Sequence, residues 1–197
     1  MLFNKKALRD DLPKNIGFAS IVEAPGEVVE GILYDIVDDH LQPLDESERY
    51  PDHYDRIEVI VEIEDERIPC FAYKAQPDKV ASGLRPSRNY LNHILSAKDF
   101  LSVQYFKALD GSQTYEDDCH CCGNKTEVIF IREKTRLFML CQPCREARLV
   151  WGDAVGRQLT VDESREVMQQ LVMGKEGYSS IPELIAAAVA KKLINDV

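Results

Sequence analysis

Apolar and polar residues alternate along the first third of the chain. Residues 56–64 are the clearest case, because isoleucine or valine recurs at every second position, as a strand with one buried face requires. Similar patterns predict strands at residues 17–23, 28–36 and 68–75. The turn at residues 65–67 is expected to join the last two strands into a hairpin.

Helical patterns occupy the spaces between and after these strands. An acidic stretch with Pro43 in its first turn predicts a short helix at residues 38–48. Ser87 predicts the N-cap of a helix that continues through Leu95, and a second short helix is expected to end near Leu109. Capping-box patterns at residues 160–163 and 180–183 predict two further helices in the carboxy-terminal tail.

Length, charge and hydropathy limit the class of protein. The chain has 197 residues, of which 45% are hydrophobic, enough to bury a core. Its formal charge of −10 opposes a general attraction to nucleic acid or to an anionic membrane. The longest apolar run, residues 184–190, is far shorter than the roughly 20 residues of a membrane-spanning helix, and residues 1–6 lack the apolar core of a signal peptide. We therefore expect a folded cytoplasmic protein with no membrane partner.

Four of the six cysteines form two pairs with the spacing Cys119-x2-Cys122-x18-Cys141-x2-Cys144. Each C-x2-C turn can direct two thiolates at one ion, and this paired spacing is typical of a four-ligand zinc site. Four thiolates fill a tetrahedral shell and leave no position for water or substrate. The sequence therefore predicts a structural Zn2+ ion that takes no part in chemistry.

The residues around the two cysteine pairs predict a small metal-stabilised fold. Gly123 permits a tight turn after the first pair, residues 127–140 read as a β-hairpin, and a helix follows from about Arg145 to Trp151. Knuckle, hairpin and helix in this order resemble a treble clef or a zinc ribbon. Residues 119–148 contain more basic than acidic side chains. The favoured interpretation is that these cations balance the negative charge of the thiolates, rather than that they bind a nucleic acid.

His120, Cys121 and Cys70 are not expected to be metal ligands or catalytic groups. His120 and Cys121 are alternative ligands, but the spacing favours the view that they are bystanders. Cys70 lies inside a predicted strand, where a buried apolar role is favoured over that of a nucleophile. In a reducing compartment none of the six is expected to form a disulfide.

Several short motifs follow one another between residues 31 and 91. They are Gly-Ile-Leu-Tyr-Asp-Ile at 31–36, Leu-Asp-Glu-Ser-Glu at 44–48, Pro-Asp-His-Tyr-Asp-Arg at 51–56 and Pro-Ser-Arg-Asn-Tyr-Leu at 86–91. In this order they resemble the γ-glutamylcyclotransferase family, over about the first 110 residues. The resemblance implies a small mixed β-sheet or barrel wrapped around a cavity.

The resemblance also implies an activity. In this reaction the α-amine of a small γ-glutamyl amine or peptide attacks its own γ-carbonyl, which yields 5-oxoproline and a free amine. The family's catalytic glutamate falls on Glu48, which would pass a proton from the attacking amine to the leaving amine without a cofactor. Tyr54 and Tyr90 match aromatic residues that the family places near the glutamyl group. From the residues alone, Glu46 and Glu48 read as a solvated helix end and the tyrosines as ordinary packing.

One part of the family pattern has no counterpart in the sequence. Relatives begin with a strand and a Tyr-Gly-Ser-Asn loop, whose backbone groups hold the substrate and act as an oxyanion hole. Here residues 2–5 align with a later strand of the family. Two explanations stay open: either the stated chain starts late, or the loop and its chemistry have been lost.

Taken together, the patterns predict an α+β protein in four parts. They are a γ-glutamylcyclotransferase-like domain at residues 1–110, a linker at 111–118, a zinc-binding segment at 119–152 and a helical tail at 153–197. The second hypothesis is a catalytically inactive scaffold whose zinc ribbon binds a protein or a nucleic acid.

Overall fold

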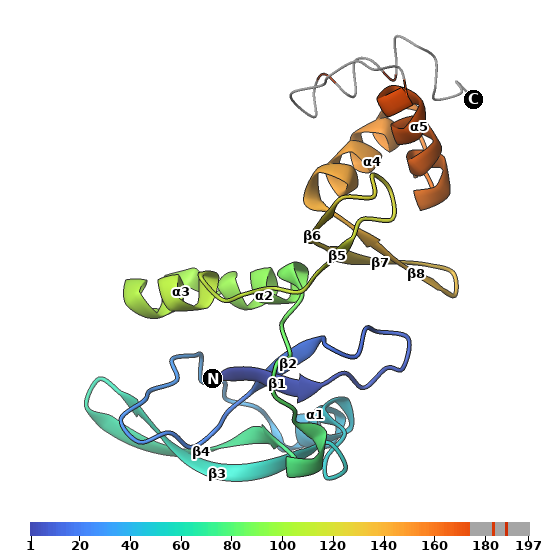
Figure 1. The fold of residues 1–197 in the computed structure, drawn as a ribbon. Coiled ribbons are helices and arrows are strands. Elements are labelled where there is room, and N and C mark those ends of the chain that lie inside the picture. The colour runs from blue at the N-terminus through green and yellow to red at the C-terminus, as the bar shows by residue number, and fades with distance from the viewer. Residues whose placement is uncertain (174–182, 184–187, 189–197) are drawn as a thin grey trace. The chain divides into compact units, whose positions relative to one another are not determined.

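The structure is a computed structural model that describes residues 1–173 together with Glu183 and Ala188 (Figure 1). The chain divides into two compact units. The first comprises residues 1–86 and 90–113, and the second comprises residues 87–89 and the chain from Thr114 onward. The division into four parts that the sequence predicts stays a prediction.

Two antiparallel strand pairs form the sheets of the first unit. Strand β1 (Leu2–Lys6) pairs with β2 (Gly17–Ser20), and β3 (Tyr54–Ile63) pairs with β4 (Glu66–Ala75). The hairpin runs in register from the pair of Tyr54 and Ala75 to the pair of Ile63 and Glu66. This confirms the predicted hairpin, and β1 is a strand that the alternation did not reveal.

Short helices complete the first unit. They are η1 (Asp38–His40), α1 (Leu41–Glu48), η2 (Pro77–Lys79), α2 (Arg88–Leu95), η3 (Lys98–Phe100) and α3 (Val103–Asp110). Helix α1 ends where Arg49 adopts a left-handed conformation with φ of 56° and its N–H bonds to the carbonyl of Asp45. The hydroxyl of Ser102 caps α3 by accepting the N–H of Tyr105.

The strand predicted at residues 28–36 is wrong, because these residues have no regular structure. Alternation gives only a local preference, and a strand also needs a neighbour that satisfies its backbone N–H and C=O groups. No strand of the described residues pairs with this segment. Val28 and Tyr34 are consequently 74% and 72% exposed.

The second unit contains two further strand pairs and two helices. Strand β5 (Glu116–Asp118), at the end of the predicted linker, pairs with β6 (Lys125–Glu127), and β7 (Ile129–Glu133) pairs with β8 (Arg136–Leu140). Helices α4 (Gln142–Ala154) and α5 (Val161–Met173) follow. Apolar residues of β8, of both helices and of the segment between the helices form one core with the cysteines, which includes Phe138, Leu140, Trp151, Leu159, Val161 and Val167.

The capping box predicted at the start of α5 is present. The N–H of Glu163 donates to Thr160 Oγ1 over 3.2 Å, and the Glu163 carboxylate accepts the N–H of Thr160 over 2.7 Å. The second predicted capping box, at residues 180–183, and the helix it would open lie outside the described residues.

The predicted α+β class is confirmed. Within the described part of the chain the sheets are two-stranded and antiparallel, in place of a single mixed sheet or a closed barrel. No described helix combines the length and the apolar character needed to cross a bilayer.

Candidate functional site

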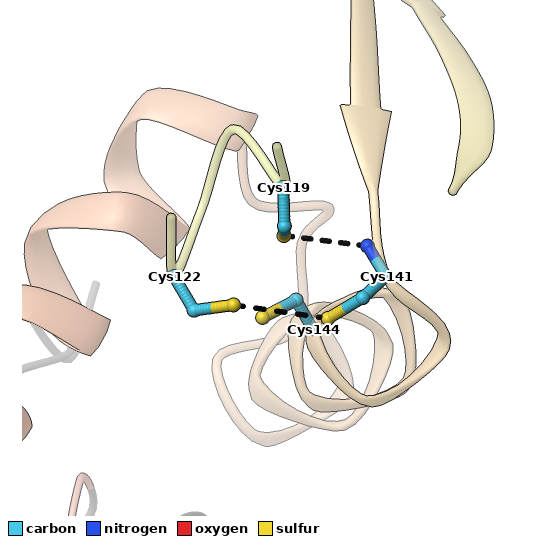
Figure 2. A group of neighbouring side chains, drawn as sticks. All are labelled: Cys119, Cys122, Cys141 and Cys144. Atoms are coloured by element: carbon cyan, nitrogen blue, oxygen red, sulfur yellow. Dashed lines mark hydrogen bonds between the residues drawn. The ribbon is translucent and has the colours of Figure 1, made fainter. Parts of the chain in front are cut away.

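The four paired cysteines converge in the second unit (Figure 2). Cys119 and Cys122 lie in the turn between β5 and β6, Cys141 is the N-cap of α4, and Cys144 lies in the first turn of that helix. Their Sγ atoms all lie within 4.8 Å of one another, and those of Cys122 and Cys141 are 3.9 Å apart. Metal–sulfur bonds of about 2.3 Å require S···S separations of about 3.8 Å in a tetrahedron. The cluster therefore fits one metal ion, while the identity of that ion as Zn2+ stays a prediction.

The local backbone explains how the cysteines are aimed. Gly123 has φ of +78°, in the left-handed region that favours glycine, and this allows the turn after the first pair. The N–H of Cys141 donates to Cys119 Sγ over 3.3 Å, which joins the end of β8 to that turn. Knuckle, hairpin and helix follow in the predicted order.

The thiols interact strongly with one another. Hydrogen bonds from Cys141 and Cys144 lower the pKa of Cys119, which accepts them. The same contact with Cys119 raises the pKa of Cys141 to about 12, and the contacts with Cys119, Cys121 and Cys141 raise that of Cys144. Binding of a metal ion would favour the thiolates and release the protons of the thiols.

The two neighbouring side chains that could have replaced a ligand have other partners. The Cys121 thiol lies 3.4 Å from the carbonyl oxygen of Ser164. His120 Nδ1 accepts the N–H of Met139 over 3.2 Å. Neither residue belongs to the four-sulfur cluster, and Cys70 is a half-buried residue of β4 in the other unit.

Two of the basic residues near the cysteines are neutralised within the second unit. Arg148 is 5% exposed, pairs with Glu133 and donates from Nε to the carbonyl of Leu159 over 2.7 Å. Glu133 also accepts the N–H of Val161 over 3.1 Å, so this ion pair connects β7, α4 and the start of α5. Arg136 pairs with Asp162 at 3.2 Å. These contacts reduce the positive charge available to a nucleic acid.

A second group of side chains that can take part in chemistry lies in the first unit. It begins with Asp45 and Glu48, two carboxylates three residues apart in α1. Asp45 accepts from Arg56 Nη1 at 3.0 Å and from the Tyr73 hydroxyl at 2.5 Å. Burial, together with this bond to Asp45, raises the pKa of Tyr73 to about 12. Asp45 therefore ties α1 to the β3–β4 hairpin. Because residues three apart share a helix face, it also fixes the direction of Glu48.

Glu48 and Glu46 occupy different environments, although both come from the same acidic stretch. Glu46 is exposed and accepts from Gln42 Nε2 over 3.0 Å on the helix surface. Glu48 is half-buried, and this desolvation raises its pKa against the opposing influence of the Lys5 ammonium. A carboxyl group with a raised pKa can exchange protons closer to neutral pH than a free glutamate can.

The hydroxyls of Tyr54 and Tyr90 bond to the backbone of one residue of β2, Ala19. Tyr54 donates to the carbonyl oxygen of Ala19 over 3.2 Å, and the N–H of Ala19 donates to the Tyr90 hydroxyl over 3.1 Å. Burial raises the pKa of both phenols, and the charge of Glu48 acts in the same direction. The two tyrosines and Glu48 therefore belong to one neighbourhood, although they come from β3, α2 and α1.

Sequence reasoning missed two residues of this neighbourhood. Asp45 could have been found from its spacing of three residues from Glu48 within one helix. Lys5 is 1% exposed, and its Nζ lies 5.4 Å from the centre of the Tyr54 ring. A lysine two residues after Phe3 in a strand is expected on the same face as that aromatic residue, which was the available signal.

Comparison with known families agrees with this architecture. Residues 4–92, a little under half of the chain, match the family described as gamma-glutamyl cyclotransferase, AIG2-like. This part of the chain is therefore a γ-glutamylcyclotransferase-type domain, as the order of the motifs had indicated. Comparisons with curated proteins and with solved structures gave no match.

Proposed function

We propose that the protein is a γ-glutamylcyclotransferase-like enzyme that releases 5-oxoproline and an amine from a small γ-glutamyl substrate. The observation that carries this proposal is the environment of Glu48. Glu48, to which the resemblance assigns the role of the catalytic glutamate, is half-buried, has a raised pKa and acts electrostatically on Tyr54 and Tyr90. The tyrosine side chains would line the place where the glutamyl group binds.

In the proposed reaction, Glu48 is both the base and the acid. Its carboxylate takes a proton from the α-ammonium group, and the free amine then attacks the γ-carbonyl carbon, forming the ring C–N bond. The protonated Glu48 gives its proton to the leaving nitrogen, and the bond from that carbon to this nitrogen breaks. The ring nitrogen still carries two protons, and Glu48 passes one of them to the departing amine, which leaves as an ammonium ion. No net proton is gained or lost by the enzyme in one turnover.

The replacement Glu48→Gln tests the proposal, with release of 5-oxoproline from γ-glutamyl amides as the assay. Turnover is expected to fall about 100- to 10,000-fold, the usual contribution of a general acid or base. Glu46→Gln is the matched control, because that carboxylate is exposed and bonded to Gln42. Unchanged turnover in Glu48→Gln would refute the assignment.

The alternative proposal is a catalytically inactive scaffold whose four-cysteine segment binds a partner. The internal ion pairs of Arg136 and Arg148 favour a protein over a nucleic acid in that case. Wild-type protein that releases no 5-oxoproline from any γ-glutamyl amide would support the scaffold.

A further inference from the structure

Lys5 is a buried cation without an anionic partner. It lies in β1, opposite Phe18 of β2 and bridged on its other side to Val80, and it is 1% exposed. Its Nζ donates to the carbonyl oxygen of Lys6 over 2.7 Å and lies over the Tyr54 ring. Among the residues that the structure describes, no carboxylate forms an ion pair with Lys5. Burying a charge in this way is costly unless something compensates for it.

The charges around Lys5 do not supply that compensation. Lys79 and Lys6 repel the ammonium group. Asp78 attracts it but is paired with Lys79 at 2.5 Å, and Glu48 also attracts it but forms no ion pair with it. The nearby His53 is also affected, since burial and the charges of Lys5 and Lys79 lower its pKa. The surroundings of Lys5 are therefore suited to an anion supplied by a ligand.

An ammonium group has three N–H donors, and Lys5 uses one of them for the carbonyl of Lys6. The other donors have no acceptor among the described residues. Tyr54 and Glu48, which share this neighbourhood, are only half-buried, so solvent reaches the neighbourhood from their side. The flexible stem of a lysine lets its ammonium group turn toward such a molecule.

We propose that Lys5 binds the α-carboxylate of the γ-glutamyl group, an assignment that rests on the proposed function. The α-carbon of this substrate carries a carboxylate and an ammonium group, and the site offers one cation, Lys5, and one anion, Glu48. Pairing the carboxylate with Lys5 directs the ammonium group toward Glu48, which must take its proton. A charge-assisted hydrogen bond of this kind also selects against acyl groups that lack the carboxylate.

The variants Lys5→Met and Lys5→Arg test the assignment. Lys6→Met is the matched control, because its exposed side chain donates to the carbonyl of Asp78 instead. The two substrates are a γ-glutamyl amide and its analogue with an α-carboxamide in place of the α-carboxylate. Lys5→Met is expected to lower kcat/KM for the carboxylate substrate about 10- to 100-fold, as loss of a hydrogen bond to a charged group does. Turnover of the carboxamide should fall much less than that of the carboxylate, and Lys5→Arg should recover part of the loss.

A binding measurement gives an answer that does not depend on turnover. Calorimetry compares 5-oxoproline, which keeps the carboxylate, with 2-pyrrolidinone, which lacks it. The affinity for 5-oxoproline should fall about 10- to 100-fold in Lys5→Met, and that for 2-pyrrolidinone should stay the same. If the wild type releases no 5-oxoproline, the proposed function fails, but the calorimetry still decides the role of Lys5.

Two results would overturn the assignment. One is equal affinity of the wild type and Lys5→Met for 5-oxoproline, including no measurable binding to either. The other is an equal loss of turnover for both substrates together with a shifted pH profile, which would mean that Lys5 acts through Glu48. A thermal melt guards against a folding defect, because removal of an unpaired buried charge is expected to preserve or raise the melting midpoint.

Discussion

Removal of the metal ion should unfold the second unit, and the size of the effect follows from the position of the cysteines. Three of the four cysteines lie inside the unit's core with the fully buried Trp151, Leu140 and Val161, and Cys122 packs against that core. A structural zinc ion contributes about 10–16 kcal/mol in small zinc domains. The whole stability of a typical domain is about 5–15 kcal/mol. The free energy lost with the ion should therefore exceed the stability that the apolar contacts of this unit can supply alone.

The single tryptophan of the chain makes this change measurable. Trp151 is fully buried in α4, seven residues after Cys144, so its fluorescence reports on this unit alone. Treatment with a chelator should shift its emission to longer wavelength and expose α4 to protease. Loss of the metal, verified by elemental analysis, with unchanged emission and protease resistance would refute the reasoning.

Variants of the adjacent residues Cys121 and Cys122 distinguish metal coordination from packing as the source of this unit's stability. Cys121 is 4% exposed and outside the cluster, whereas Cys122 is a cluster member and only half-buried. If packing were the main source of stability, Cys121→Ser would destabilise the second unit more than Cys122→Ser, because Cys121 is the more buried residue. Coordination predicts the reverse order, in which Cys122→Ser loses the metal and the Trp151 signal while Cys121→Ser keeps both. Equal metal loss in the two variants would show that the ligand set is wrong.

Two further predictions concern pH and an ion pair. Turnover should fall on the acid side with a midpoint above pH 4.5, because burial raises the pKa of Glu48 above that value and the carboxylate must be ionised to accept a proton. A midpoint at or below pH 4.5 would contradict this prediction. The folded state binds the proton of the Glu48 carboxyl group more tightly than the unfolded state does, so ionised Glu48 lowers the stability of the fold at pH values above its folded pKa. Below pH 4.5 the group is protonated in both states and does not affect stability. Glu48→Gln should therefore raise the melting midpoint at neutral pH only. Arg148→Met should lower the free energy of unfolding of the second unit by about 3 kcal/mol, because it leaves Glu133 without its buried partner. Arg136→Met removes an ion pair whose arginine is 65% exposed and should cost less than about 1 kcal/mol; equal losses in urea titrations would contradict the argument.

Features that depend on neighbouring residues in the sequence could be predicted well. The β3–β4 hairpin follows from strict alternation on both sides of a short turn, and the start of α5 follows from Thr160 and Glu163. The cysteine cluster belongs to the same class, since each pair is local and a single ion would join the two pairs. Only the meeting of the pairs is non-local, and the regular spacing was enough to anticipate it.

Features that depend on distant neighbours could not be predicted in this way. Residues 28–36 alternate as a strand does, but pairing is decided by the rest of the sheet, and none of the described strands offers a partner. The burial of Lys5 depends on Phe18 and Val80, which lie 13 and 75 residues further along the chain. A sequence pattern shows that Lys5 is charged, but it does not show that the residue lies inside the fold.

The hydrogen bonds at Ala19 have a consequence for association between molecules. An outer strand usually leaves backbone N–H and C=O groups free, and a strand from another copy can attach to them and start aggregation. In β2 the Tyr54 and Tyr90 hydroxyls already occupy both groups of Ala19, so an incoming strand would have to displace two side chains from different elements. The rings and the hydroxyls of these tyrosines can therefore serve separate purposes. Under the proposed function the rings would line the substrate site, while the hydroxyls protect the edge of β2.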